Sequence, residues 1–82
     1  MNVPGPEPEY SNAELLRVIR LLPDPVVTAK EVTSRVTLQN ATVNRRLDTL
    51  VDAGLLNQKK VGASAVVYWL TEEGRSKAGY ED

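Results

Sequence analysis

The feature that most constrains this chain is a long helical pattern that continues directly into a hairpin pattern. Apolar residues recur at helical spacing from residue 38 to residue 53, and Gly54 follows as a left-handed stop. Residues 55–70 then read as two extended segments around a glycine-bearing tip at residues 62–64. A helix with one apolar side needs other elements to cover that side. Its apolar residues are Val43, Leu47 and Leu50, with Val51 beside them.

Two capping boxes predict the starts of two earlier helices. Glu14 follows Ser11 by three residues, and Glu31 follows Thr28 at the same spacing, so each cap can satisfy free amides of its first helical turn. A Pro-Asp-Pro segment ends the first helix, because proline lacks an amide donor. The second helix is short, about eight residues, and needs tertiary packing to hold it. Thr37 is expected to cap the turn that follows it.

The second strand of the hairpin is predicted to have two unlike faces. Side chains alternate along a strand, so Tyr68 and Leu70 share one face while Val67 and Trp69 share the other. We expect Tyr68 on the core side. Trp69 then lies on a second face that the first helix, the last helix or a partner subunit would cover. Thr71 is expected to cap a last short helix.

The order of elements predicts an α+β fold with a three-helix core, a β-hairpin wing and a short C-terminal helix. Two short helices joined by a tight turn and followed by a hairpin are typical of a winged helix-turn-helix. Residues 11–79 are expected to form this domain. Residues 1–10 are predicted to be a disordered acidic, proline-rich arm, and residues 80–82 a frayed tail.

The chain contains neither cysteine nor histidine. This excludes a disulfide framework, a thiolate nucleophile and a cysteine-based zinc site, and it removes the commonest general base. The sequence has no glycine-rich phosphate loop and no cluster of metal ligands. We therefore expect no enzyme activity, cofactor, metal or small-molecule substrate. The longest apolar run, residues 65–70, is too short to span a membrane, so no membrane association and a cytoplasmic location are expected.

Four segments carry a resemblance to a known family, and they are residues 28–36, 38–47, 47–56 and 68–75. In this order they resemble winged helix-turn-helix DNA-binding regulators, namely small archaeal and archaeal-phage repressor-like proteins, broadly similar to MarR- and ArsR-type winged helices. The resemblance implies sequence-specific binding of duplex DNA in transcriptional control, with the third helix in the major groove and the wing on the backbone or minor groove. It also implies DNA contacts at the start of the third helix. The implied contact residues are Gln39, Asn40, Thr42, Asn44, Arg45 and Arg46.

The side-chain chemistry of this region supports the same prediction. Asparagine and glutamine can pair with adenine, arginine with guanine, and threonine can meet a thymine methyl. Residues 28–70 have a net charge of +3, although the whole chain has −1. Lysines near the hairpin tip suit phosphate contact. The candidate list therefore also includes Thr49, Lys59, Lys60 and Ser64.

Several of these candidates also have an alternative interpretation. The two arginines could lie on a solvated helix face, and Gln39 and Asn40 could serve only the turn and the helix cap. Lys59 and Lys60 could simply protect an edge strand. We therefore predict a transcriptional regulator, more specifically a repressor, that binds double-stranded DNA as a homodimer. A winged-helix adaptor that binds other proteins and not DNA remains the second hypothesis.

Overall fold

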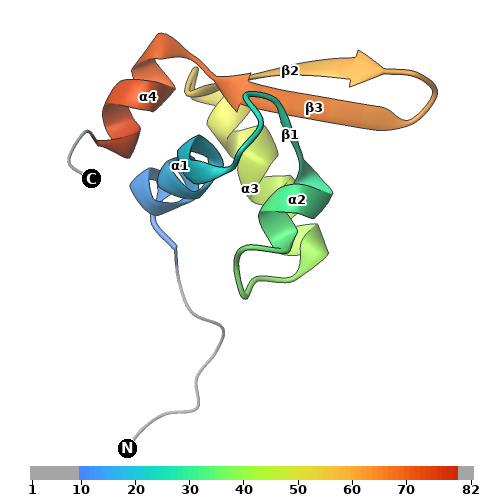
Figure 1. Cartoon of the computed structure of the whole chain (residues 1–82), viewed down its shortest axis with the longest axis horizontal. Coiled ribbons are helices and arrows are strands. Elements are labelled where there is room, and N and C mark those ends of the chain that lie inside the picture. The colour runs from blue at the N-terminus through green and yellow to red at the C-terminus, as the bar shows by residue number, and fades with distance from the viewer. Residues whose placement is uncertain (1–9, 80–82) are drawn as a thin grey trace, which may run out of the picture.

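The computed structural model describes residues 10–79, which form helices around a small antiparallel sheet (Figure 1). The predicted fold, a three-helix core with a β-hairpin wing and a short C-terminal helix, is confirmed. The tail at residues 80–82 and all of the predicted arm except Tyr10 lie outside the described residues. The elements are α1 (Asn12–Leu21), β1 (Val27–Thr28), α2 (Ala29–Thr33), α3 (Asn40–Asp52), β2 (Leu56–Val61), β3 (Ala65–Leu70) and α4 (Glu72–Ala78).

Both predicted capping boxes are present. The Ser11 hydroxyl accepts a hydrogen bond from the Glu14 amide at 3.1 Å, and the Glu14 carboxylate accepts one from the Ser11 amide at 2.7 Å. The hydroxyl of Thr28 and the carboxylate of Glu31 repeat this exchange at the start of α2, at 3.2 and 2.9 Å. These reciprocal bonds fix where each helix begins.

The turn between α2 and α3 differs from the prediction. Helix α2 ends at Thr33 and is shorter than expected, and α3 begins at Asn40 instead of residue 38. The backbone of Gln39 is extended, with a φ of −77° and a ψ of 156°, so the helix cannot begin before Asn40, and Leu38 packs into the core from the turn. Thr37 does not cap α3. Its amide instead donates a hydrogen bond to the hydroxyl of Tyr10 at 3.3 Å.

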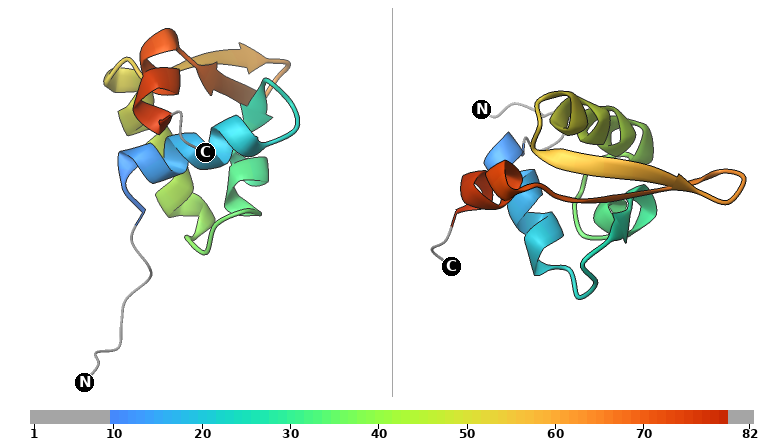
Figure 2. Two further views of the ribbon diagram at one scale, coloured as in Figure 1. Left: turned by 60° about the vertical axis from the view of Figure 1, so that its left-hand side comes forward. Right: turned by 90° about the horizontal axis from the view of Figure 1, so that it is seen from above.

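The three strands pair in the order β1–β3–β2, and α3 packs against β2 (Figure 2). Gln58 lies opposite Tyr68 in the register and Asn57 lies opposite Trp69. Tyr68 is buried in the core and Trp69 lies half-buried on the other face of the sheet, as predicted. Gly62, at the hairpin tip, has a φ of +67°, a conformation that glycine adopts without steric cost.

One apolar core joins all of these elements. Burying each of its large side chains stabilises the fold by about 1.5–3 kcal/mol, before the cost of ordering the chain is subtracted. Within residues 10–79, no helix is both long and apolar enough to cross a bilayer. The buried core residues are Leu15, Leu16, Ile19, Val27, Val32, Leu38, Val43, Leu47, Leu50, Leu56, Tyr68 and Ala78.

Candidate nucleic-acid interface

Helix α3 exposes a polar stripe on the side away from the core. Asn44, Arg45 and Thr49 are exposed, whereas Thr42 is half-buried beside them. The Asn44 side-chain amide donates to the carbonyl of Asn40 at 3.0 Å, and the Thr49 hydroxyl donates to the carbonyl of Arg45 at 3.1 Å. These bonds hold the side chains of Asn44 and Thr49 close to the helix surface. Arg45 is the long cationic side chain of the stripe, and it extends from this surface into solvent.

The N-terminal end of α3 has no side-chain cap. Gln39 occupies the cap position, but its side chain makes no cap hydrogen bond, and the first helical turn contains no acidic residue. Gln39 therefore serves the turn through its backbone and provides no side-chain cap. The amides of the first turn and the positive end of the helix dipole are left for water or an anion.

Helix α2 lies against the start of α3 and forms a shallow hollow with it. The hydroxyl of Thr33 lies 2.8 Å from the carbonyl of Ala29 and 3.1 Å from Oδ1 of Asn40, so it links the two helices. Lys30 and Ser34 also line the hollow, and both are exposed. These two residues were absent from the predicted site. The packing of α2 on α3 in a helix-turn-helix was the signal that could have found them.

Arg46 lies on a different side of α3 from Arg45. Its guanidinium donates to the carbonyl of Tyr10 at 2.8 Å and to Oδ1 of Asn12 at 3.1 Å. Tyr10 in turn packs against the core and its hydroxyl accepts the Thr37 amide. These bonds and this packing hold Tyr10 against the folded domain. The structure does not bring Arg46 together with the other predicted contacts.

The two lysines of the wing point to opposite faces of the sheet. In the register, Lys60 lies opposite Val66 and Lys59 lies opposite Val67, and paired residues share a face. Lys60 is thus on the face that carries Tyr68 and that α3 covers, whereas Lys59 is on the face that carries Trp69. Both lysines are exposed, as is Ser64 at the wing tip. Only Lys60 shares a face with α3.

The acidic residues of α3 lie in its second half. Asp48 and Asp52 are both exposed. Burial raises the pKa of the Tyr68 phenol, and the Asp48 carboxylate raises it further, while a hydrogen bond with the Gln58 side chain opposes the shift. Asp48 therefore faces the root of the wing. This leaves the N-terminal half of α3 as its non-acidic end.

No family model and no curated protein matches the chain. Solved structures do match. A mutant MarR from E. coli complexed with operator DNA has a TM-score of 0.70 and 22% identity, covering 82% of this chain and 48% of that chain. A mutant ZitR from Lactococcus lactis in complex with DNA has a TM-score of 0.68 and 17% identity, covering 82% and 45%. The adhesin competence repressor from Streptococcus pyogenes has a TM-score of 0.68 and 17% identity, covering 82% and 49%.

These likenesses establish the fold. The chain folds as a winged helix-turn-helix of the kind found in MarR-type regulators, and the predicted resemblance is confirmed at that level. The chain spans slightly less than half the length of these proteins, 45% to 49% for the three compared here.

Proposed function

We propose that this chain binds duplex DNA sequence-specifically and regulates transcription. The observation that carries the proposal is the exposure of polar and cationic side chains on α3, on α2 and on one face of the wing. Arg45 and Asn44 on α3, Lys30 on α2 and Lys60 on the wing are all exposed. Helix α2 packs against α3, and Lys60 lies on the face of the wing that α3 covers (Figure 1). Two similar structures are complexes with DNA, which supports the same function.

In the proposed complex, the N-terminal half of α3 lies in the major groove and reads base edges. Arg45 contacts guanine and Asn44 or Gln39 contacts adenine, while Thr42 and Thr49 meet thymine methyls or phosphates. Asn40 remains tied to Thr33 and sets the angle between α2 and α3. The residues proposed for phosphate contact are Lys30, Lys60 and Ser64, together with the free amides at the start of α3.

We further propose that the protein is a repressor that occupies its operator as a homodimer. One domain of this size covers a single major-groove segment, so useful affinity requires two copies on a two-fold site. Occupancy alone is then sufficient to block transcription. Regulation by abundance or by a protein partner fits a chain without cysteine or histidine.

Selection of bound duplexes from a random pool tests the proposal. The expected result is an enriched two-fold motif whose half-sites lie about 10 base pairs apart. Arg45→Ala should abolish the enrichment, whereas Lys77→Ala on α4 removes the same charge and should leave it intact. Failure to enrich any sequence, with binding to random duplex that does not depend on salt, would favour the adaptor hypothesis instead.

A further inference from the structure

Tyr10 bridges three parts of the molecule that lie far apart in the sequence. It directly precedes Ser11, the cap residue of α1, and its side chain packs against the core. Its hydroxyl accepts a hydrogen bond from the amide of Thr37, in the turn between α2 and α3, at 3.3 Å. Its carbonyl accepts another from the guanidinium of Arg46, in the middle of α3, at 2.8 Å. A single residue thus contacts the start of α1, the turn and the proposed reading helix.

The bond to Thr37 falls where the chain turns into α3. The amide of Val36 still donates within the turn, to the carbonyl of Thr33 at 3.4 Å. The next amide, that of Thr37, instead donates to Tyr10, which lies 27 residues earlier. Two residues further on, the extended Gln39 begins α3 without a side-chain cap. The backbone position of Thr37 therefore helps to decide where the first turn of α3 is placed.

A second attachment holds α3 at its middle. The side chain of Arg46 is half-buried, and its guanidinium donates to the carbonyl of Tyr10 and, at 3.1 Å, to Oδ1 of Asn12. Helix α3 is thus tied to Tyr10 twice, through the turn that precedes it and through its own side chain. Together with the core packing, two attachments fix the direction of the helix, whereas one would let it pivot. The side chains proposed to read bases, Asn44 and Arg45, lie between the two attachments.

We propose that Tyr10 is a positioning residue for base reading. It contacts no base itself. It fixes the direction of the N-terminal half of α3 before DNA arrives, so less conformational freedom is lost on binding and a larger fraction of the protein is competent to bind. The inference rests on the proposed function and deepens it, because it extends the determinants of DNA affinity to a residue outside the helix-turn-helix.

Tyr10→Phe is the sharpest variant, because it keeps the packed ring and the backbone carbonyl and removes only the hydroxyl. It should weaken binding to the duplex selected from the random pool by about threefold to tenfold, the factor by which one hydrogen bond of ordinary strength shifts such an equilibrium. Binding to random duplex depends on phosphate contacts and should change less. Fluorescence anisotropy titrations with both duplexes measure the ratio of the two affinities. A ratio equal to that of the unmodified chain would overturn the proposal.

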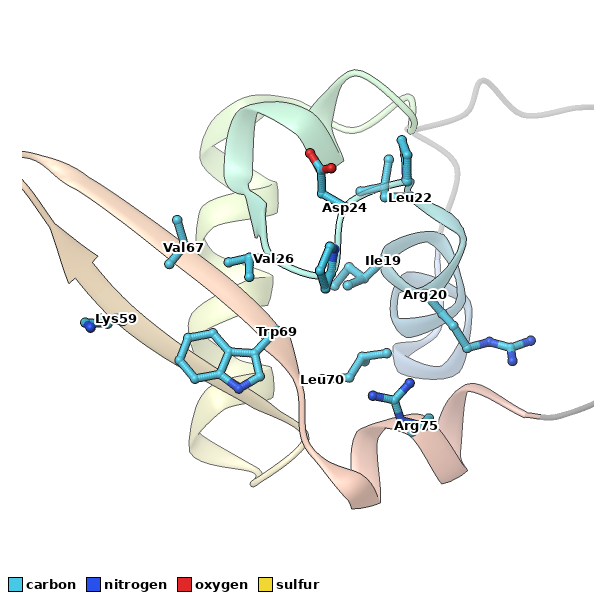
Figure 3. A pocket seen from close by; sticks show the side chains of 12 residues that line it. Ile19, Arg20, Leu22, Asp24, Val26, Lys59, Val67, Trp69, Leu70 and Arg75 are labelled. Atoms are coloured by element: carbon cyan, nitrogen blue, oxygen red, sulfur yellow. The ribbon is translucent and has the colours of Figure 1, made fainter.

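The control variant lies in a groove on the face of the sheet opposite to α3 (Figure 3). This groove around Trp69 is lined mainly by α1, β3 and α4 and by the connection that follows α1. Leu22 lines it and also packs against the core, so Leu22→Ala should destabilise the fold. The variant leaves the turn before α3 untouched, so its affinity for the selected duplex should stay unchanged well below the unfolding temperature. Equal losses of affinity in Leu22→Ala and Tyr10→Phe would make Tyr10 a general stabiliser and overturn the proposal.

Amide chemical shifts of the free, isotopically labelled chain test the attachment without DNA. Tyr10→Phe should move the amides of residues 37–41, because the turn loses its bond to the phenol and the first turn of α3 follows it. The amides of α4 should stay where they are. Unmoved amides at residues 37–41 would overturn the proposal whatever the result with DNA.

Arg45→Ala separates the failure of this proposal from the failure of the proposed function. If Arg45→Ala removes the preference for the selected duplex and Tyr10→Phe keeps it in full, only the role of Tyr10 is refuted. If the unmodified chain prefers no duplex over another, the proposed function fails, and the role of Tyr10 in base reading fails with it.

Discussion

Gly74 has no room for a larger side chain. A Cβ at this position would overlap the carbonyl group of Leu55. The same contact is held by two hydrogen bonds from Thr71, whose amide donates to the carbonyl of Leu55 at 3.2 Å and whose hydroxyl donates to the carbonyl of Gly54 at 2.8 Å. The Thr-x-x-Gly step thus docks α4 onto the connection between α3 and β2.

Gly74→Ala should therefore lower the free energy of unfolding by about 2 kcal/mol or more, because rigid backbone atoms must move to admit the methyl group. Urea unfolding measures this change. Ser76→Ala, at an exposed position of the same helix, is the matched control and should stay within about 0.5 kcal/mol of the unmodified chain. Equal stability of both variants would show that α4 does not approach the backbone this closely.

The adjacent residues Arg45 and Arg46 should separate binding from stability. Arg46→Met should lower the free energy of unfolding by about 1–2 kcal/mol, because it removes the bonds to Tyr10 and Asn12. Arg45→Met should leave stability nearly unchanged and weaken DNA binding. Urea unfolding and a fluorescence anisotropy titration with duplex measure the two effects. The opposite pattern would place Arg46 at the DNA and Arg45 in the fold.

The raised pKa of Tyr68 predicts a loss of stability in alkali. The phenol ionises more readily in the unfolded chain, at its ordinary value of 10.0, than in the fold. The free energy of unfolding should therefore fall as the pH rises through that value, until the folded phenol ionises as well. Unfolding curves from about pH 8 to about pH 11 should fall more steeply than those of Tyr68→Phe. Parallel curves for the two proteins would contradict the burial of this phenol.

At the scale of elements, the sequence predicts what local spacing determines. The two capping boxes locate the starts of α1 and α2, and Gly54, with a φ of +80°, ends α3 as predicted. Long-range contacts decide the rest. The start of α3 shifts because the backbone of Gln39 is extended where Leu38 packs into the core, and no local pattern predicts this.

In the candidate site too, local spacing predicts some features and long-range contacts determine the others. Helical periodicity correctly identifies the exposed stripe that contains Asn44 and Arg45. It cannot identify the role of Arg46, whose partners lie 34 and 36 residues earlier in the chain. The different faces of Lys59 and Lys60 follow from strand alternation once the register is known. Treating the two lysines as equivalent ignored that alternation.

The wing therefore offers a matched pair of variants. Lys60→Gln should weaken DNA binding and reduce the dependence of log affinity on log salt by about 0.9, the value expected for the loss of one phosphate contact. Lys59→Gln removes the same charge from the opposite face and should change the salt dependence much less. Titrations at several salt concentrations measure both. A larger effect for Lys59 would mean that the wing meets DNA with its other face.

In the whole molecule, the proposed reading surface and the groove around Trp69 lie on opposite faces of the sheet. The first consists of the N-terminal half of α3 with α2 and the wing tip, and the second is lined by α1, β3 and α4. Occupation of the groove would therefore leave the reading surface open. The net charge of −1 does not oppose DNA binding, because the cationic excess lies in residues 28–70.

The claim that α3 reads DNA can be tested by titrating the isotopically labelled chain with duplex DNA and following the amide chemical shifts. We expect the shifts to concentrate in residues 39–45 of α3, near Lys30 of α2 and at residues 60–64 of the wing. Amides around Trp69 and along α4 should change little. Shifts confined to α1 and α4, or no shifts at any concentration of duplex, would contradict the claim that α3 reads DNA.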